Sequence, residues 1–158
     1  MSIFIENIGN ILLGLSVLVA IIFGVLGWSS NQKAQLRAHT INLIGNLSLN
    51  TDLATADAEV AKLVRKNAKL SAADITESID RSLMRILDYY EFLCVAYREG
   101  AMEKKTFNHL RGSTMILLYH VADRYINERR EIYGDSLYKN YEVVVKELSS
   151  EKGNHTGC

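Results

Sequence analysis

The chain has 158 residues, with 18 basic and 18 acidic side chains, and therefore no formal net charge. This length suits one domain of ordinary size with a small extra element. Without a basic excess, bulk binding of nucleic acid is not expected, and any anion site has to be a local cluster. The two cysteines, Cys94 and Cys158, show no disulfide or metal-ligand spacing, and proline is absent, so we expect helices in a reducing compartment.

The first element is a charge-free stretch, ILLGLSVLVAIIFGVLGW, over residues 11–28. As a helix it reaches about 27 Å, close to the thickness of a bilayer's hydrocarbon core. Trp28 lies where an interfacial anchor is expected. A secretory signal peptide is the alternative, but the preceding MSIFIENIGN has no Lys or Arg, and GWSSNQKAQ is a poor cleavage site. We therefore predict a single retained transmembrane helix within residues 1–30.

Flanking charge predicts the orientation of this helix. Lys33 and Arg37 follow the apolar stretch, and no basic side chain precedes it. The positive-inside rule then places the N-terminus outside and the C-terminal part in the cytoplasm.

Small residues recur every four positions within the stretch, at Ser16, Ala20 and Gly24. Such a stripe lets two helix backbones approach closely, which predicts self-association through this face. The alternative is that small residues are simply common in membrane helices.

Residues 31–149 have the apolar periodicity of a helical cytoplasmic domain. The first helix is expected to continue to Leu47, and NTD at residues 50–52 offers caps for a second helix. SAAD at residues 71–74 predicts the start of a third helix, which Gly100 ends.

A fourth helix is expected from Glu103, with Gly112 as a break or kink. GDS at residues 134–136 precedes a last helix, and residues 150–158 form a polar tail that we expect to be disordered. The predicted fold is all-α: one transmembrane helix followed by a cytoplasmic helical bundle.

Several basic clusters are candidates for binding an anionic ligand. The segment EKKTFNHLRG combines basic side chains with a helix start, which suits phosphate, and nearby aromatic rings are able to stack on bases. The candidate ligand-binding residues are Arg81, Arg85, Lys104, Lys105, His109, Arg111, Arg129 and Arg130. A further stripe, formed by Lys62, Arg65, Lys66 and Lys69, suits anionic lipid heads or is a solvated helix face.

The sequence contains no recognisable catalytic apparatus. No Ser-His-Asp arrangement, P-loop or dinucleotide-binding glycine pattern is present. His109 and His120 share a helix face but lack a close third partner for a metal ion. We therefore expect no enzyme activity, no cofactor and no metal.

Glu91 is an acidic residue inside the apolar run ILDYYEFLCVAYREG. A carboxylate there is costly unless it is paired or hydrogen-bonded. We expect it to pair with a basic side chain of the next helix, at Arg111, His120 or Arg124. This would make Glu91 a latch between the third and fourth helices rather than a general acid or base.

Residues 86–130 resemble a bacterial and phage family of unknown function whose members often carry one N-terminal membrane helix. The shared positions are an aromatic-aromatic-Glu-aromatic core, a later glycine, an acidic helix start, a mid-helix glycine and a Glu-Arg ending: Tyr89, Tyr90, Glu91, Phe92, Gly100, Glu103, Gly112, Glu128 and Arg129. The resemblance implies an all-helical fold without enzyme activity. Together with the predicted membrane helix, we expect the protein in the bacterial inner membrane. The family's usual Asp-Glu is replaced by MEKK, which makes this helix start more basic.

The layout is also similar to small ancillary effectors of type III CRISPR systems. This resemblance implies a cyclic tetra-adenylate ligand on the axis of a tetramer, with phosphates on Arg and Lys and adenines near Tyr. Binding would change the packing of the membrane helices and damage the membrane. The competing interpretation is a membrane-anchored interaction or phage-exclusion protein without a small ligand.

Overall fold

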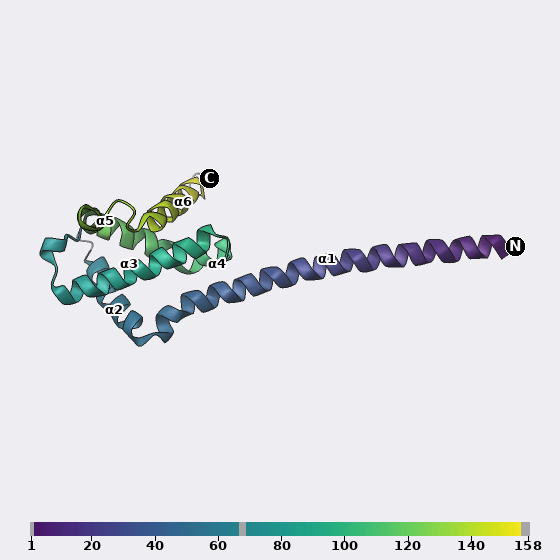
Figure 1. The fold of residues 1–158 in the computed structure, drawn as a ribbon, viewed down its shortest axis with the longest axis horizontal. Helices are drawn as coiled ribbons and strands as arrows, with labels where there is room; N and C mark the ends of the chain where they lie inside the picture. The colour runs from purple at the N-terminus through teal and green to yellow at the C-terminus, as the bar shows by residue number, and fades with distance from the viewer. Residues whose placement is uncertain (1, 67–68, 156–158) are drawn as a thin grey trace. The chain divides into compact units, whose positions relative to one another are not determined.

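The computed structural model describes the backbone of residues 2–66 and 69–155 and the side chains of residues 15–66 and 69–151. Within these ranges the regular elements are helical and no strand occurs, which confirms the predicted all-α fold (Figure 1). The elements are α1 (Ser2–Leu49), α2 (Thr51–Arg65), η1 (Ala72–Asp74), α3 (Glu77–Arg98), α4 (Lys104–Phe107), η2 (Asn108–Gly112), α5 (Ser113–Tyr133) and α6 (Lys139–His155). The chain divides into two compact units, Met1–Leu36 and Arg37–Cys158.

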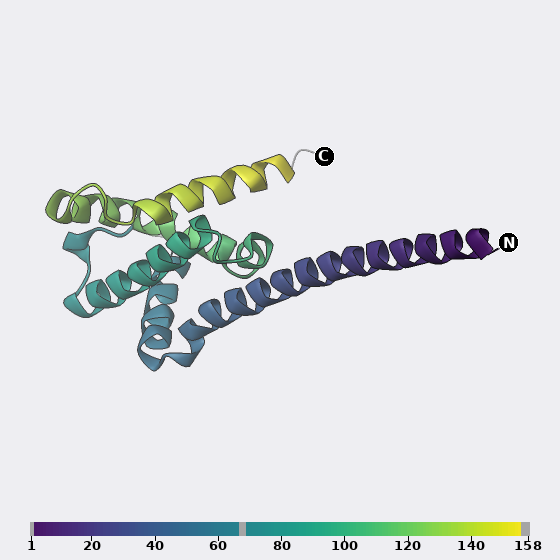
Figure 2. The same ribbon diagram turned by 45° about the vertical axis from the view of Figure 1, so that its right-hand side comes forward.

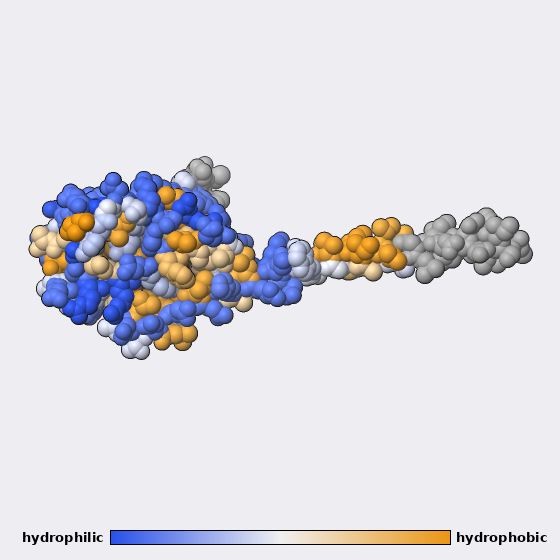
Figure 3. All heavy atoms as spheres, in the orientation of Figure 1, coloured by the Kyte–Doolittle hydropathy of each residue, from blue (hydrophilic) through white to orange (hydrophobic). Residues whose placement is uncertain are grey.

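The first unit is the N-terminal part of α1. Its side chains from Leu15 to Trp28 carry no charge and are exposed, and Figure 3 shows them as an orange, hydrophobic stretch. Among the described residues, α1 is the helix that is long and apolar enough to cross a membrane, which agrees with the predicted span. The predicted stretch begins at residue 11, and its side chains before Leu15 lie outside the described residues.

The second unit is a helical bundle built around α3. Figures 1 and 2 show α3 between α2 on one side and α6 on the other, and both neighbours pack against it. The core also takes in the end of α1, through the buried side chains of Thr40, Ile44 and Leu47. The same helix therefore presents an exposed apolar stretch near its start and a buried face near its end.

Tyrosines supply much of the bulk of this core. Tyr97, Tyr125 and Tyr141 are fully buried, yet their hydroxyl groups donate to Glu147 at 3.1 Å, Asp80 at 2.6 Å and the Met115 carbonyl at 2.7 Å. Because a buried hydroxyl without a partner is costly, these bonds allow the large rings to be used for packing. They also fix which helices face one another.

Local capping explains where α2 and α3 begin. The Asn50 side chain accepts from the N–H groups of Asp52 at 3.0 Å and Leu53 at 3.1 Å, so the predicted cap of α2 is present. The predicted start of the third helix at residues 71–74 is different in the structure. Ser71 caps only the short turn η1, and Thr76 caps α3.

The end of α3 and the helix after it largely follow the prediction. Gly100 has φ +72°, the left-handed conformation that favours glycine after a helix, and so ends α3 as predicted. The helix expected from Glu103 starts as α4, passes through η2, which is a π-helical turn, and continues as α5. Gly112 closes that turn, so the expected irregularity occurs as a π turn rather than as a break.

The last helix continues further than predicted. It follows two residues with positive φ, Gly134 at +99° and Tyr138 at +54°. The Tyr138 hydroxyl also donates a hydrogen bond to Asp88 at 3.0 Å. The backbone remains helical to His155, within the segment 150–158 that we expected to be disordered. Residues 156–158 of that segment lie outside the described residues.

Candidate functional site

Glu91 is a latch, but its partner is not the one predicted. Its carboxylate accepts from the Asn140 N–H at 3.1 Å, the Asn140 amide side chain at 2.7 Å and the Tyr141 N–H at 2.8 Å. These N–H groups lie in the first turn of α6, where helix backbone donors lack internal partners. The expected ion pair with Arg111, His120 or Arg124 is therefore wrong, because backbone donors of α6 satisfy the charge.

Arg129 and Arg130 lie inside the bundle, in ion pairs. Arg129 forms an ion pair with Asp80 and lies over the Tyr125 ring, with its guanidinium carbon 5.2 Å from the ring centroid. Arg130 donates to Glu142 at 3.0 Å and to a backbone carbonyl at 2.9 Å, and its side chain is only 14% exposed. Both arginines, which we predicted to bind a ligand, are therefore paired within the protein, with Asp80 and Glu142.

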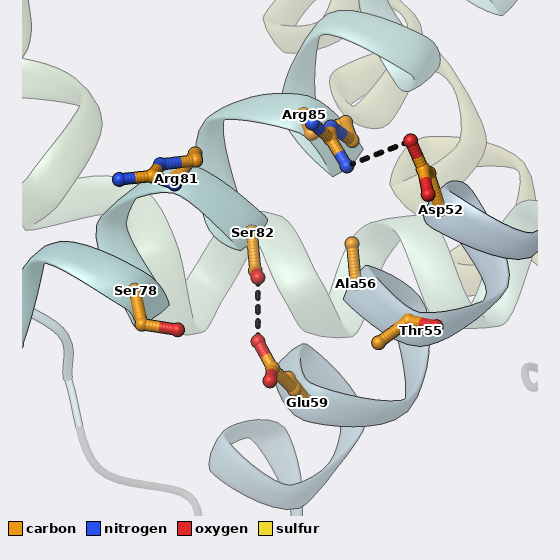
Figure 4. A pocket seen from close by; sticks show the side chains of 8 residues that line it. All are labelled: Asp52, Thr55, Ala56, Glu59, Ser78, Arg81, Ser82 and Arg85. Atoms are coloured by element: carbon orange, nitrogen blue, oxygen red, sulfur yellow. Dashed lines mark hydrogen bonds and ion pairs between the residues drawn. The ribbon is translucent and has the colours of Figure 1, made fainter.

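Arg81 and Arg85 line a small groove between α2 and α3 (Figure 4). Arg85 points toward Asp52, 3.6 Å away, and Arg81 binds Glu77 at 2.9 Å within its own helix. Glu59 also lines the groove and accepts a bond from Ser82. A groove of about 170 Å³ that contains two carboxylates is a poor place for a phosphate, because like charges repel.

The segment after α3 separates its basic residues onto different surfaces. Lys104 turns toward α6, where it binds Glu147 at 3.1 Å and lies 4.6 Å above the Tyr97 ring. Arg111 is half-buried beside Tyr90. Burial raises the pKa of Tyr90 to about 12, and the nearby Arg111 guanidinium partly lowers it again. Only Lys105 and His109 of this segment come together on one surface.

That surface is a cleft between the end of α1 and the π turn, which we call the π-turn cleft. Its volume is about 430 Å³. It is lined by Arg37, Ile41, Lys105, Thr106, His109 and Leu110. Among the described residues, no acidic side chain binds Lys105 or His109. π turns often occur at functional sites, because the extra residue changes which side chains a helix presents.

An ion pair forms one wall of the π-turn cleft. Arg37 donates to both carboxylate oxygens of Glu103, at 3.2 and 3.1 Å, and the Glu103 N–H donates to Thr40 at 2.7 Å. The Arg37 hydrogen bond, joined by one from Thr106, lowers the pKa of Glu103 to about 2. The helix start predicted to suit a phosphate therefore already holds a carboxylate of the chain itself.

A second surface feature is an apolar groove, which we call the Phe92 groove. It has a volume of about 480 Å³ and is lined by Leu43, Asn46, Leu49, Asn50, Leu53, Tyr89 and Phe92. Phe92 is 56% exposed and Leu49 is 81% exposed. Large exposed apolar side chains that adjoin one another mark interaction surfaces.

The remaining predicted features lie apart from both surfaces. Of the predicted basic stripe, Lys62 and Arg65 are exposed on α2 and Lys66 is its C-cap. Lys69 is exposed beyond the end of the helix, so the four side chains do not share one helix face. Ser16, Ala20 and Gly24 are exposed on α1, and their proposed role in self-association stays a prediction. Over the described residues, no group of three His, Cys, Asp or Glu side chains lies close enough to hold a metal ion.

Sequence reasoning missed two parts of these surfaces. Arg37 entered only as a charge that orients the membrane helix, because its partner Glu103 lies 66 positions further along the chain. The sequence did not predict that Leu49 is exposed and lines a groove with Phe92. Apolar periodicity does not distinguish a buried core position from an exposed position in a groove. For Glu91 the sequence gave no such signal, because GDS at residues 134–136 offers its own caps and only the structure shows that α6 begins at Lys139.

Comparison with known protein families shows where this chain belongs. The family described as "Domain of unknown function (DUF4760)" matches residues 14–148, which takes in most of α1 and the helices as far as α6. No curated protein matches the chain, and no solved structure does.

Proposed function

The chain belongs to the DUF4760 family, and from that premise we propose that it is a single-span protein of the bacterial inner membrane that acts by binding. In this proposal α1 anchors a helical domain at the cytoplasmic face, and the domain recognises a partner instead of catalysing a reaction. This is an interaction protein of the kind that excludes phage or organises other membrane proteins.

The observation that carries this proposal is the two-part character of α1. Residues 15–28 are apolar and exposed, a composition that is costly in water and suited to lipid. From Thr40 onward the same helix contributes buried side chains to the bundle. The helix that would anchor the protein therefore also contributes side chains to the core of the folded domain.

Three features of the bundle favour binding over catalysis. Arg129 and Arg130 are the least exposed of the bundle's arginines in the ion pairs described, and they stabilise its interior. The thiol of Cys94 is fully buried, and burial raises its pKa well above the usual range, so it stays protonated and unreactive. The Phe92 groove, in contrast, offers apolar area to a partner.

Cysteine labelling tests the proposed topology. In a Cys94→Ala, Cys158→Ser background, we would place single cysteines at Ser2 and at Glu99, an exposed position at the end of α3. A membrane-impermeant maleimide should label Ser2→Cys in intact spheroplasts and Glu99→Cys only after lysis. Labelling of Glu99→Cys in intact spheroplasts would contradict the cytoplasmic location.

A second candidate function is the sensing of a cyclic oligoadenylate in antiviral defence. Lys105 and His109 favour it, because they lie together in the π-turn cleft without an acidic partner among the described residues. In a homo-oligomer, four copies of this pair around an axis would suit the four phosphates of cyclic tetra-adenylate. Binding that drew Arg37 from Glu103 would act directly on α1.

Calorimetry on the full-length protein in neutral detergent tests this candidate. Cyclic tetra-adenylate should bind with a Kd of about micromolar or tighter, as two or more charge-assisted contacts per copy allow. A Lys105→Ala, His109→Ala variant should lose that binding, while Lys104→Ala, on the surface toward α6, should keep it. Absence of heat with the wild-type protein would exclude this candidate and leave the interaction protein.

A further inference from the structure

We propose that the π-turn cleft binds an anionic phospholipid of the membrane in which α1 is anchored. The headgroup phosphate is held by Lys105 and His109, and the start of an acyl chain lies on Ile41 and Leu110. This inference rests on the membrane anchoring proposed above and specifies a ligand for the bundle.

Charge gives the first part of the case. Of the basic side chains that line the cleft, Arg37 is neutralised by its two bonds to Glu103. Lys105 and His109 are exposed and, within the described part of the chain, have no acidic partner. The cleft therefore has a local positive excess, although the whole chain has none.

The apolar lining gives the second part. Ile41 is 49% exposed and Leu110 is 45% exposed, and both line the cleft. A free phosphate would leave these two side chains in water. A phospholipid covers them with its acyl chain while its headgroup meets the cations, so it satisfies both kinds of lining.

The length of chain between anchor and cleft gives the third part. Arg37 follows Trp28 by nine positions, a stretch that reaches at most about 30 Å even when fully extended. Trp is the side chain expected at the membrane–water interface. The cleft is consequently tethered within reach of the headgroups of the leaflet from which α1 emerges.

Native mass spectrometry of the full-length protein in neutral detergent tests the lipid proposal. The probes are short-chain phosphatidylglycerol, which is anionic, and short-chain phosphatidylcholine, which is zwitterionic. We expect phosphatidylglycerol adducts to exceed phosphatidylcholine adducts by about fivefold, the contribution of one lysine charge such as Lys105. A Lys105→Gln, His109→Gln variant should bind both lipids equally.

The matched control removes the same two residue types from other helices. Lys139→Gln at the start of α6 combined with His120→Gln on α5 changes exposed positions outside the cleft and should leave the preference unchanged. Melting of each variant, followed by circular dichroism in the same detergent, establishes that each is folded.

Three outcomes would overturn the proposal. They are equal wild-type binding of the two lipids, an unchanged preference in the cleft variant, and displacement of phosphatidylglycerol by equimolar inorganic phosphate or cyclic tetra-adenylate. The last would assign the cleft to a soluble anion. None of them alters the labelling result that tests membrane topology, so failure of the lipid site and failure of the anchor are distinguishable.

Discussion

At the scale of single residues, this bundle satisfies its interior charges with partners that lie far away in the sequence. Glu91 meets the start of α6, Arg130 meets Glu142, and Asp80 meets Arg129. A buried charge that loses its partner is strongly destabilising, so these pairs specify which helices meet. These side chains therefore stabilise the fold and are not available to bind a ligand.

The first prediction concerns Glu91. Glu91→Gln keeps the shape but replaces one acceptor oxygen by a donor, which faces the N–H groups of Asn140 and Tyr141. We expect the free energy of unfolding to fall by about 1–3 kcal/mol, as for a lost bond to a charged group. Urea unfolding in detergent measures this, with Glu99→Gln at the exposed end of α3 as the control. Equal stability of both variants would show that Glu91 is not a latch.

The second prediction concerns acid stability. Hydrogen bonding to Lys146, Lys139 and Arg130 lowers the pKa of Glu142 from 4.5 to about 2. Because the folded-state pKa is depressed, the stabilisation is complete above about 4.5 and disappears as the pH falls through about 2. Glu142→Gln should be less stable at neutral pH and lose less stability over that acid range.

Urea midpoints measured across the acid range for both proteins test this prediction. Parallel curves for the wild type and Glu142→Gln would contradict it, because the variant has no carboxylate to protonate at this position. The Glu103 carboxylate, whose pKa is also about 2, contributes in the same direction in both proteins. The comparison therefore isolates the contribution of Glu142.

At the scale of elements, periodicity and caps predict much of this fold. The cap at Asn50 and the stop at Gly100 are short-range features, which involve only neighbouring backbone atoms. The start of α3 was misplaced because Ser71 and Thr76 are both good caps, and sequence does not say which one begins the long helix. The π turn was not predicted, since Gly112 signals irregularity without its type.

Gly112 provides the third prediction. Its φ of −53° is helical, and an added Cβ would lie 3.7 Å from the Leu148 side chain, an ordinary contact. Gly112→Ala should therefore stabilise the protein by up to about 1 kcal/mol, since glycine is unfavourable in helices. Thermal melting tests this. The control is Gly45→Ala in α1, where nothing lies within 4 Å of the added Cβ. Destabilisation by Gly112→Ala alone would mean that the π turn requires glycine.

At the scale of the whole molecule, α1 contains both a stretch long and apolar enough to cross a membrane and residues that line the candidate site. Its apolar stretch is evident from the sequence because hydropathy is a local property. The π-turn cleft is not evident, because Arg37 and Ile41 reach Lys105 and His109 only after the bundle folds. Basic clusters in the sequence therefore identify candidate ligand-binding residues, but tertiary contacts determine which of these basic side chains are paired with acids.

The claim that α1 anchors the domain is tested most directly by alkaline carbonate extraction of membranes from cells that express the full-length chain. We predict that the wild-type protein stays in the membrane pellet. A Val19→Arg, Phe23→Arg variant should appear in the supernatant, because each arginine at the centre of a span costs about 3 kcal/mol. Release of the wild-type protein into the supernatant would contradict the account.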